Sequence, residues 1–195
     1  FIMATIGQFI KIFLMIVVLV ILALSVLAAC VVKPLPKLEQ VESRAIPPSE
    51  NTMLAQILMT EKPEDNSLTG VFVLGDPLDA FVARSALLNV AEESIDLQYY
   101  IWRPDTSGMM LLRDIYAAAE RGVRVRLLLD DNNTRGMDDL LSILNDHPNI
   151  EIRLFNPFTN RKARFLGYLI DFKRLNHRMH NKSLIVDGQA AITGG

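Results

Sequence analysis

The chain opens with a long apolar stretch. After Lys11, no charged residue occurs until Lys33. The residues between them match the roughly 20 apolar positions that an α-helix needs to cross a bilayer. The hydrophobic pattern therefore predicts a membrane anchor over residues 1–32 rather than a helix of a globular core.

The end of this stretch allows two interpretations. Residues 27–30 (LAAC) are similar to the box that ends a bacterial lipoprotein signal, where small residues admit the peptidase and the cysteine thiol receives the lipid. The basic start and the apolar middle also suit a signal peptide. In this interpretation Cys30 is a lipidation site and the rest of the chain lies outside the cytoplasm. In the other, the helix stays uncleaved and Cys30 is an inert thiol within it. Basic residues flank the stretch on both sides, so orientation stays open.

Residues 33–69 are expected to form a linker. Five prolines interrupt any long helix there: Pro34, Pro36, Pro47, Pro48 and Pro63. A short helix at residues 52–59 is compatible with this pattern, but a plain spacer is the favoured interpretation.

From Gly70 onward, helix and strand signals alternate. Asp76 can cap a helix with Pro77 at its first position, and residues 94–102 are rich in the β-branched and aromatic residues of a strand. A helix from Ser107 to the stop signal at Gly122 follows, then a strand at 123–129, a helix at 137–145 and a strand at 150–155. This order predicts an α/β lobe over residues 70–195, in which helices flank a largely parallel sheet.

An acidic and amide cluster, residues 130–133 (DDNN), follows the second of these strands. Loops at strand ends often carry functional sites. Such a run is nevertheless more often a turn and a helix cap than a metal cage. We therefore assign no metal to it.

Composition narrows the function classes. Half of the 195 residues are hydrophobic and the formal net charge is −2, which argues against a disordered tail and against a globally basic nucleic-acid-binding protein. Any anionic partner must therefore meet a local basic patch. The lone cysteine excludes an internal disulfide and a zinc cluster built from several cysteines.

The candidate chemistry lies at the end of the chain. Residues 178–186 resemble a strand, Asp187 and Gly188 form a strong turn signal, and residues 189–193 can pair back as a hairpin. His180 and Lys182, two positions apart, then point to the same side. A lysine attracts phosphate oxygens, and a neutral imidazole can attack phosphorus, so the pair suits phosphodiester transfer without a metal or other cofactor. Asp187 is assigned to the same candidate site, with an orienting or structural role favoured over direct catalysis.

Histidine and lysine on a surface hairpin are ordinarily only solvated, so the wider motif decides. His180, Lys182 and Asp187, followed by Gly194 and Gly195, match the signature of the phospholipase D superfamily, His-x-Lys-x4-Asp with a glycine pair. Residues 94–102 (SIDLQYYIW), 119–130 (AERGVRVRLLLD) and 178–183 (RMHNKS) resemble bacterial cardiolipin synthases, especially their type C branch. The resemblance covers residues 70–195.

The resemblance implies two similar lobes that share one metal-independent site, each lobe giving one such motif. It makes His180 the nucleophile that forms a phosphohistidine and Lys182 a phosphate ligand. Arg178, Gly194 and Gly195 are assigned to substrate binding.

Only one His-x-Lys triplet is present, because neither His147 nor His177 is followed by lysine two positions later. The chain begins at Phe1 and stops just after a predicted strand, so we expect it to be a fragment, the first of two lobes. The second histidine, the expected acid for the leaving alcohol, must come from sequence not included or from another subunit. A monomer of this chain alone is expected to be inactive or nearly so.

The segment before the motif bears on the substrate. It intersperses basic residues with apolar ones: Arg161, Lys162, Arg164, Phe165, Leu166, Tyr168, Leu169, Ile170, Phe172, Lys173, Arg174 and Arg178. Such a mixture suits contact with lipid and headgroup phosphates, and an ordinary flexible basic loop accounts for it equally well.

The favoured function is transfer of a phosphatidyl group to the hydroxyl of a second lipid, which forms cardiolipin at a bacterial cell membrane. With a lipidated Cys30 the globular part is periplasmic, and with an uncleaved helix its side stays open. Water as acceptor would make the enzyme a phospholipase D. A phosphodiesterase acting on nucleic acid is disfavoured by the anchor and the mild acidity. A non-catalytic lipid-binding lobe is the remaining alternative.

Overall fold

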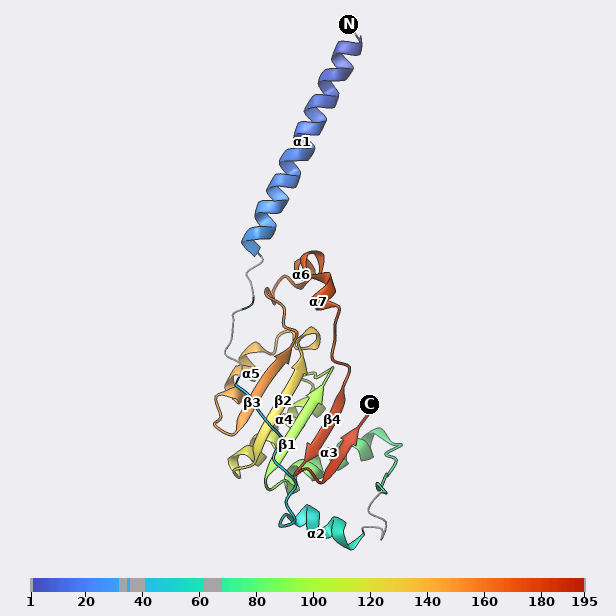
Figure 1. Cartoon of the computed structure of the whole chain (residues 1–195), viewed down its shortest axis with the longest axis vertical. Helices are drawn as coiled ribbons and strands as arrows, with labels where there is room; N and C mark the ends of the chain where they lie inside the picture. The colour runs from blue at the N-terminus through green and yellow to red at the C-terminus, as the bar shows by residue number, and fades with distance from the viewer. Residues whose placement is uncertain (1, 32–34, 36–40, 62–67, 195) are drawn as a thin grey trace. The chain divides into compact units, whose positions relative to one another are not determined.

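The structure is a computed structural model that describes residues 2–31, 35, 41–61 and 68–194 (Figure 1). For residues 2–5 and 28–31 only the backbone is described. The chain divides into two compact units. One comprises Phe1–Glu39 with Phe158–Asn176, and the other comprises Gln40–Pro157 with His177–Gly195, so residues 158–176 group apart from the sheet.

The N-terminal apolar stretch forms helix α1, Ile2–Val31. Within it, Ile6–Leu27 is long and apolar enough to cross a membrane, and its most apolar part is not buried. A helix this apolar that is not buried by any other described residue is a candidate membrane anchor, although a signal sequence has the same character. Cys30 lies in the last turn of α1, and its side chain is outside the described part, so its lipidation stays a prediction.

Five strands form one sheet in the order β3-β2-β1-β4-β5. The strands are β1 Ser94–Tyr99, β2 Arg124–Asp130, β3 Ile150–Phe155, β4 Lys182–Val186 and β5 Ala190–Thr193. The first three run parallel, which confirms the predicted β-α-β-α-β order. The hairpin β4-β5 adds to the β1 edge in antiparallel fashion, so the sheet is mixed. This direction follows because the chain re-enters the sheet at the end where β1 stops: Lys182 pairs with Tyr99.

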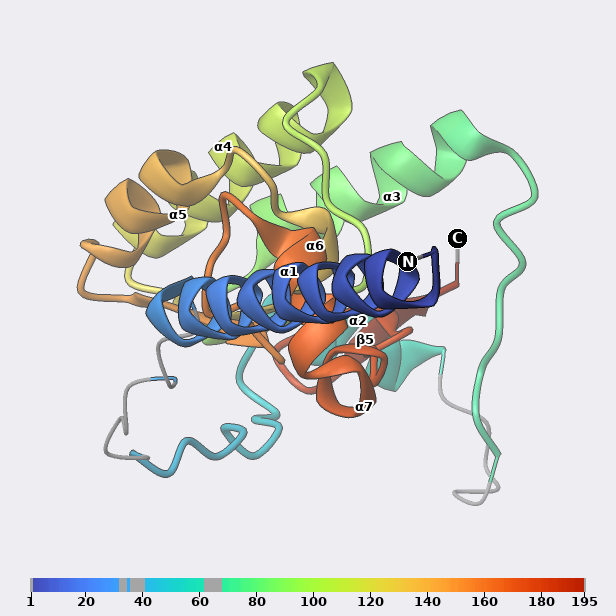
Figure 2. The same ribbon diagram turned by 90° about the horizontal axis from the view of Figure 1, so that it is seen from above.

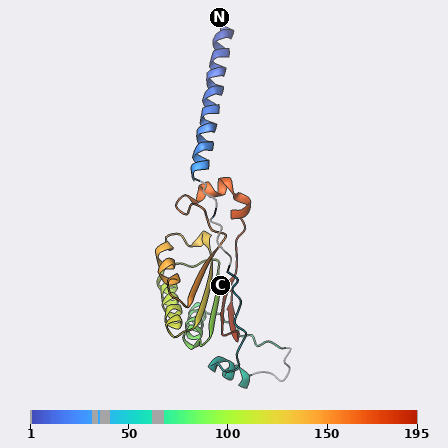
Figure 3. The ribbon, with the colours of Figure 1, turned by 60° about the vertical axis from the view of Figure 1, so that its left-hand side comes forward.

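Three helices cover one face of the sheet, as Figures 2 and 3 show: α3 Pro77–Val90, α4 Thr106–Glu120 and α5 Asp138–Asn145. Their caps follow the sequence. Asp76 accepts from the backbone N–H groups at the start of α3, with Pro77 in the first turn, and α4 begins one residue before its predicted start. The N–H of Gly108 bonds the Asp105 cap of α4 and, as the largest cause, lowers the pKa of that carboxyl. Gly122 follows α4 with a positive φ of 97°, as its stop signal predicts.

The core lies between these helices and the sheet. It includes Leu88, Ile95, Leu97, Leu112, Ile115, Val125, Leu127, Leu129, Leu141, Leu184 and Val186. Helices α3, α4 and α5 supply the leucines at 88, 112 and 141 and Ile115, and alternate positions of the strands supply the rest, as expected for a sheet with one buried face. The α/β class and the helix-flanked sheet are therefore confirmed.

Three predictions concern the shorter elements. Residues 130–133 form a turn: the Asp130 side chain caps the 3-10 helix η1, Asp131–Asn133, which confirms the turn-and-cap interpretation. Among the described residues, no group of three His, Cys, Asp or Glu side chains could hold a metal ion. A short helix, α2 Met53–Thr60, forms where the alternative interpretation placed one, and Leu54 and Ala55 are buried, so the favoured interpretation of a plain spacer is wrong for these residues. The basic and apolar segment contains helices α6 Arg164–Ile170 and α7 Phe172–Leu175 rather than a plain loop.

Candidate active site

The predicted histidine and lysine lie where β1 ends and β4 begins. The backbone N–H of Tyr100, the first residue after β1, donates to the carbonyl of Asn181 at 2.8 Å. This bond carries the strand pairing one step beyond the Tyr99 and Lys182 pair. The site thus occupies the carboxyl end of a parallel strand, where α/β proteins commonly place their ligands.

His180 and Lys182 converge as the spacing predicted. The Lys182 Nζ lies 3.1 Å from Nδ1 and 3.4 Å from Nε2 of the His180 imidazole. The strand itself begins at Lys182 rather than at residue 178, so the predicted strand was too long. The reason is that the residues just before His180 bond to a buried carboxylate instead of to a neighbouring strand.

That carboxylate belongs to Asp130, at the end of β2, and is fully buried. Its Oδ2 accepts from the backbone N–H of Met179 at 2.9 Å, and its Oδ1 accepts from Nη1 of Arg178 at 3.0 Å. The Arg178 side chain, predicted to bind substrate, is itself only 12% exposed. The contacts of Arg178 hold the chain in place just before His180, and binding of substrate by Arg178 stays a prediction.

Tyr100 is a site residue that the sequence analysis did not single out. Its ring centroid lies 4.7 Å from that of His180 at an interplanar angle of 47°, and Lys182 Nζ lies 6.0 Å from the same ring. An aromatic ring against the imidazole limits its rotation. The only sequence signal was the place of Tyr100 near the end of the strand predicted at residues 94–102, which in the structure already ends at Tyr99.

His180 and Lys182 face an open hollow of about 360 Å³. Its lining consists of His180, Asn181, Lys182, Ser183, Thr193 and Gly194. Gly194 has a positive φ of 107° and its N–H donates to the carbonyl of Lys182 at 3.0 Å, so the predicted glycine borders the same space as the lysine. Gly195 lies outside the described residues.

Asp187 lies at the opposite end of β4 from this hollow. Its buried carboxylate accepts three backbone N–H groups, from Glu92 at 3.1 Å and from Glu93 and Ser94 at 2.8 Å each. Asp187 and Gly188 both have positive φ, as their turn signal predicted. The contacts of Asp187 fasten the turn to the start of β1, which is a structural role, and a part in the reaction stays a prediction.

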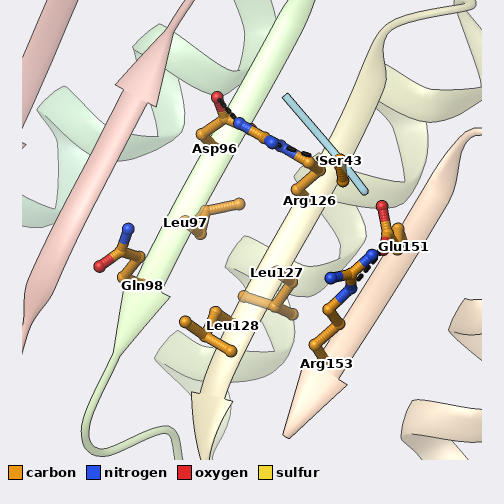
Figure 4. A pocket seen from close by; sticks show the side chains of 9 residues that line it. All are labelled: Ser43, Asp96, Leu97, Gln98, Arg126, Leu127, Leu128, Glu151 and Arg153. Carbon is orange, nitrogen blue, oxygen red and sulfur yellow. Dashed lines mark hydrogen bonds and ion pairs between the residues drawn. The ribbon is translucent and has the colours of Figure 1, made fainter. Parts of the chain in front are cut away.

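A second hollow of about 190 Å³ lies on the face of the sheet opposite to helices α3, α4 and α5 (Figure 4). Paired charges dominate it: Arg126 donates twice to Asp96, at 2.5 and 2.7 Å, and Arg153 pairs with Glu151 at 2.5 Å. The hydrogen bond to Asp96 raises the pKa of Arg126. No residue of the His-x-Lys motif lines this hollow.

The first hollow has the groups that phosphodiester chemistry needs. An imidazole nitrogen without its proton is a nucleophile, and the adjacent ammonium attracts the non-bridging oxygens of a phosphodiester. The site is also open, so a large substrate can approach with only its phosphate inserted.

Comparison with known proteins identifies the same region. A model of the family described as "Cardiolipin synthase, PLD-like domain" matches residues 85–195. "Cardiolipin synthase C" of Escherichia coli (strain K12) is 60% identical over 126 residues, which cover 65% of this chain and 27% of that protein. "Major cardiolipin synthase ClsA" of Bacillus subtilis (strain 168) is 31% identical over 132 residues, 68% of this chain and 25% of that protein. The chain thus spans about a quarter of the length of these relatives.

Two solved structures resemble the chain more distantly. NucT from Helicobacter pylori has a TM-score of 0.41 and 19% identity, and covers 59% of this chain and 65% of its own. Nuc from Salmonella typhimurium, a phospholipase D family member, has a TM-score of 0.37 and 20% identity, over 54% and 56% of the two chains. Similarity at this level does not bear on function.

Proposed function

The chain belongs to the family of cardiolipin synthase PLD-like domains, and on this premise we propose that it supplies half of the active site of a phosphatidyltransferase that forms cardiolipin. The observation that carries the proposal is the 3.1 Å contact between Lys182 Nζ and His180 Nδ1 at the edge of an open hollow. The donor is a phospholipid, and the acceptor is the hydroxyl group of a second lipid.

In the first step a His180 nitrogen attacks the phosphorus of the donor lipid. The bond from phosphorus to the leaving oxygen breaks as the nitrogen–phosphorus bond forms, and the leaving alkoxide takes a proton from a general acid. In the second step the acceptor hydroxyl gives its proton to the same group and attacks phosphorus, and the nitrogen–phosphorus bond breaks. Lys182 offsets charge on the non-bridging oxygens in both steps.

The general acid is proposed to be a second histidine from another His-x-Lys lobe. This chain contains one such triplet, so the partner lobe belongs to the remainder of a longer protein or to another subunit. We further propose that the N-terminal segment holds the site at a bacterial cell membrane, through a lipidated Cys30 or through an uncleaved α1, with the globular part on the periplasmic side. The mass of the mature protein distinguishes a lipidated Cys30 from an uncleaved helix.

The test uses the full-length protein in phospholipid vesicles, with cardiolipin and phosphatidic acid followed by mass spectrometry. We expect cardiolipin from the native protein and none from His180→Ala. The matched control is His177→Ala, which removes a nearby exposed imidazole outside the His-x-Lys spacing and should keep activity. Phosphatidic acid alone would identify a phospholipase D. Product formation that does not depend on His180 would overturn the proposal in favour of a lipid-binding lobe.

A further inference from the structure

Helices α6 and α7 form a helical pair with a small core of its own. The Phe158 and Tyr168 rings pack edge to face with centroids 5.4 Å apart, and Leu175 is buried. Gly167 permits this packing, because a Cβ there would lie 2.9 Å from Leu175 Cδ1 and 3.3 Å from the Phe158 ring. Phe158, Tyr168 and Leu175 therefore form the apolar contacts that hold the two helices together.

Four further apolar side chains are exposed. Phe165 is 67% exposed, Leu169 77%, Ile170 45% and Phe172 60%. Phe165 and Leu169 are four positions apart on α6, so their side chains are neighbours on one side of the helix. We call these four residues the outer apolar residues. Large apolar side chains gathered in so short a segment mark a contact site rather than ordinary surface.

The charges of the segment indicate the kind of partner. Residues 158–176 carry five cationic side chains and one carboxylate, Asp171, which pairs with Arg174. Lys162 and Lys173 are exposed and flank the outer apolar residues in sequence. Apolar side chains bordered by cations suit a bilayer surface, where the former enter the boundary of the acyl chains and the latter meet anionic headgroups.

We infer that the α6–α7 pair is a second membrane contact, which rests on an anionic phospholipid surface with Phe165 and Leu169 inserted. The same chain carries the exposed apolar helix Ile6–Leu27, a candidate membrane anchor that would bring the rest of the chain to a bilayer. The inference concerns lipid contact and not the reaction, so it stands or falls separately from the proposed function.

Tryptophan fluorescence can test it in the full-length protein. The only native tryptophan, Trp102, is 5% exposed and supplies a constant background. Phe165→Trp and Leu169→Trp each place a probe among the outer apolar residues. Ile143→Trp is the matched control, because Ile143 is 66% exposed on α5, in the other unit. The proteins are reconstituted in vesicles of phosphatidylcholine and phosphatidylglycerol with bromine atoms on the acyl chains.

We expect bromine quenching of the probes at 165 and 169 to exceed that at 143 by about two-fold or more. Reversing charge with Lys162→Glu and Lys173→Glu in the Phe165→Trp protein should reduce the quenching, as should removal of phosphatidylglycerol. Quenching no greater than that of the control overturns the inference. So does a blue-shifted emission that brominated lipid leaves unchanged, because protein would then cover the probes.

Discussion

Asp130 and Arg178 form an ion pair at 3.0 Å across 48 positions of sequence, and the carboxylate of the pair is fully buried. The second oxygen of the same carboxylate binds the N–H of Met179. A buried charge is costly unless it is paired and hydrogen-bonded, and both conditions are met here. The pair therefore fixes the backbone immediately before the proposed nucleophile, His180, to the end of β2.

Asp130→Asn should destabilise the protein and lower its activity. The substitution leaves the mostly buried Arg178 cation without its counter-charge, which costs about 3 to 5 kcal/mol in comparable buried pairs. Denaturant unfolding of the sheet-containing lobe in detergent measures the first effect. Cardiolipin formation by the full-length protein, assayed where the variant is folded, measures the second.

A double-mutant cycle separates the ion pair from other effects of the substitution. Arg178→Met removes the cation, so Asp130→Asn with Arg178→Met should lose less stability than the sum of the two single variants. Strict additivity would show that the two side chains are not coupled. Recovery of stability without recovery of activity would show that the pair serves the reaction beyond its effect on stability, through the position of residues 179–180 or through binding of substrate by Arg178.

Tyr100 is predicted to hold the His180 imidazole in place through its ring. Tyr100→Phe keeps the ring and should retain activity, whereas Tyr100→Leu should lower the rate about two- to ten-fold, since such ring pairs are worth about 0.5 to 1.5 kcal/mol. Initial rates of cardiolipin formation with equal amounts of folded protein measure both. A large loss in Tyr100→Phe would instead assign the role to the hydroxyl group.

Asp187→Asn tests whether that carboxylate is structural. The side chain of Asn tolerates the positive φ of 51° at this position, but its amide nitrogen cannot accept one of the three N–H groups that Asp187 binds. Leaving a buried donor unpaired should lower the free energy of unfolding by about 1 to 3 kcal/mol. Cardiolipin formation below the melting transition should be largely retained. Loss of the reaction with stability unchanged would move Asp187 into the catalytic group.

What could be predicted from the sequence was local. The meeting of His180 and Lys182 follows from alternation along an extended chain, and the Asp187-Gly188 turn follows from residues that tolerate positive φ. The caps of α3 and η1 likewise depend only on a side chain and the next few backbone N–H groups.

What could not be predicted depends on segments brought together by folding. The bonds of Asp187 to residues 92–94, and of Asp130 to residues 178–179, join positions tens of residues apart. Tyr100 meets His180 only because β4 pairs with β1, and the pattern of β4 alone does not select that neighbour. The same long-range bonds at Asp130 explain why the observed strand begins at Lys182 and not at residue 178, as predicted.

Residues 41–44 are held by hydrogen bonds from arginines of strands β2 and β3. These bonds predict how fast a protease will cut the segment. Nη1 of Arg124 donates to the carbonyl of Arg44 at 2.7 Å, the carbonyl of the bond that trypsin would cleave. The Arg44 side chain is 82% exposed and available to the protease, so release of the backbone limits cleavage. Arg124→Gln removes this bond, worth about 1 kcal/mol for a partly exposed pair, and should speed cleavage after Arg44 about five-fold.

Cleavage after Arg135, an exposed arginine in the turn before α5, is the internal control and should keep its native rate. Peptide mapping of tryptic digests over time, with the full-length protein in vesicles, measures both sites in one sample. An equal rise at both sites would mean that the substitution loosens the whole lobe. An unchanged rate after Arg44 would mean that the other arginine contacts, from Arg126 to Ser43 and from Arg153 to Val41, hold the segment without Arg124.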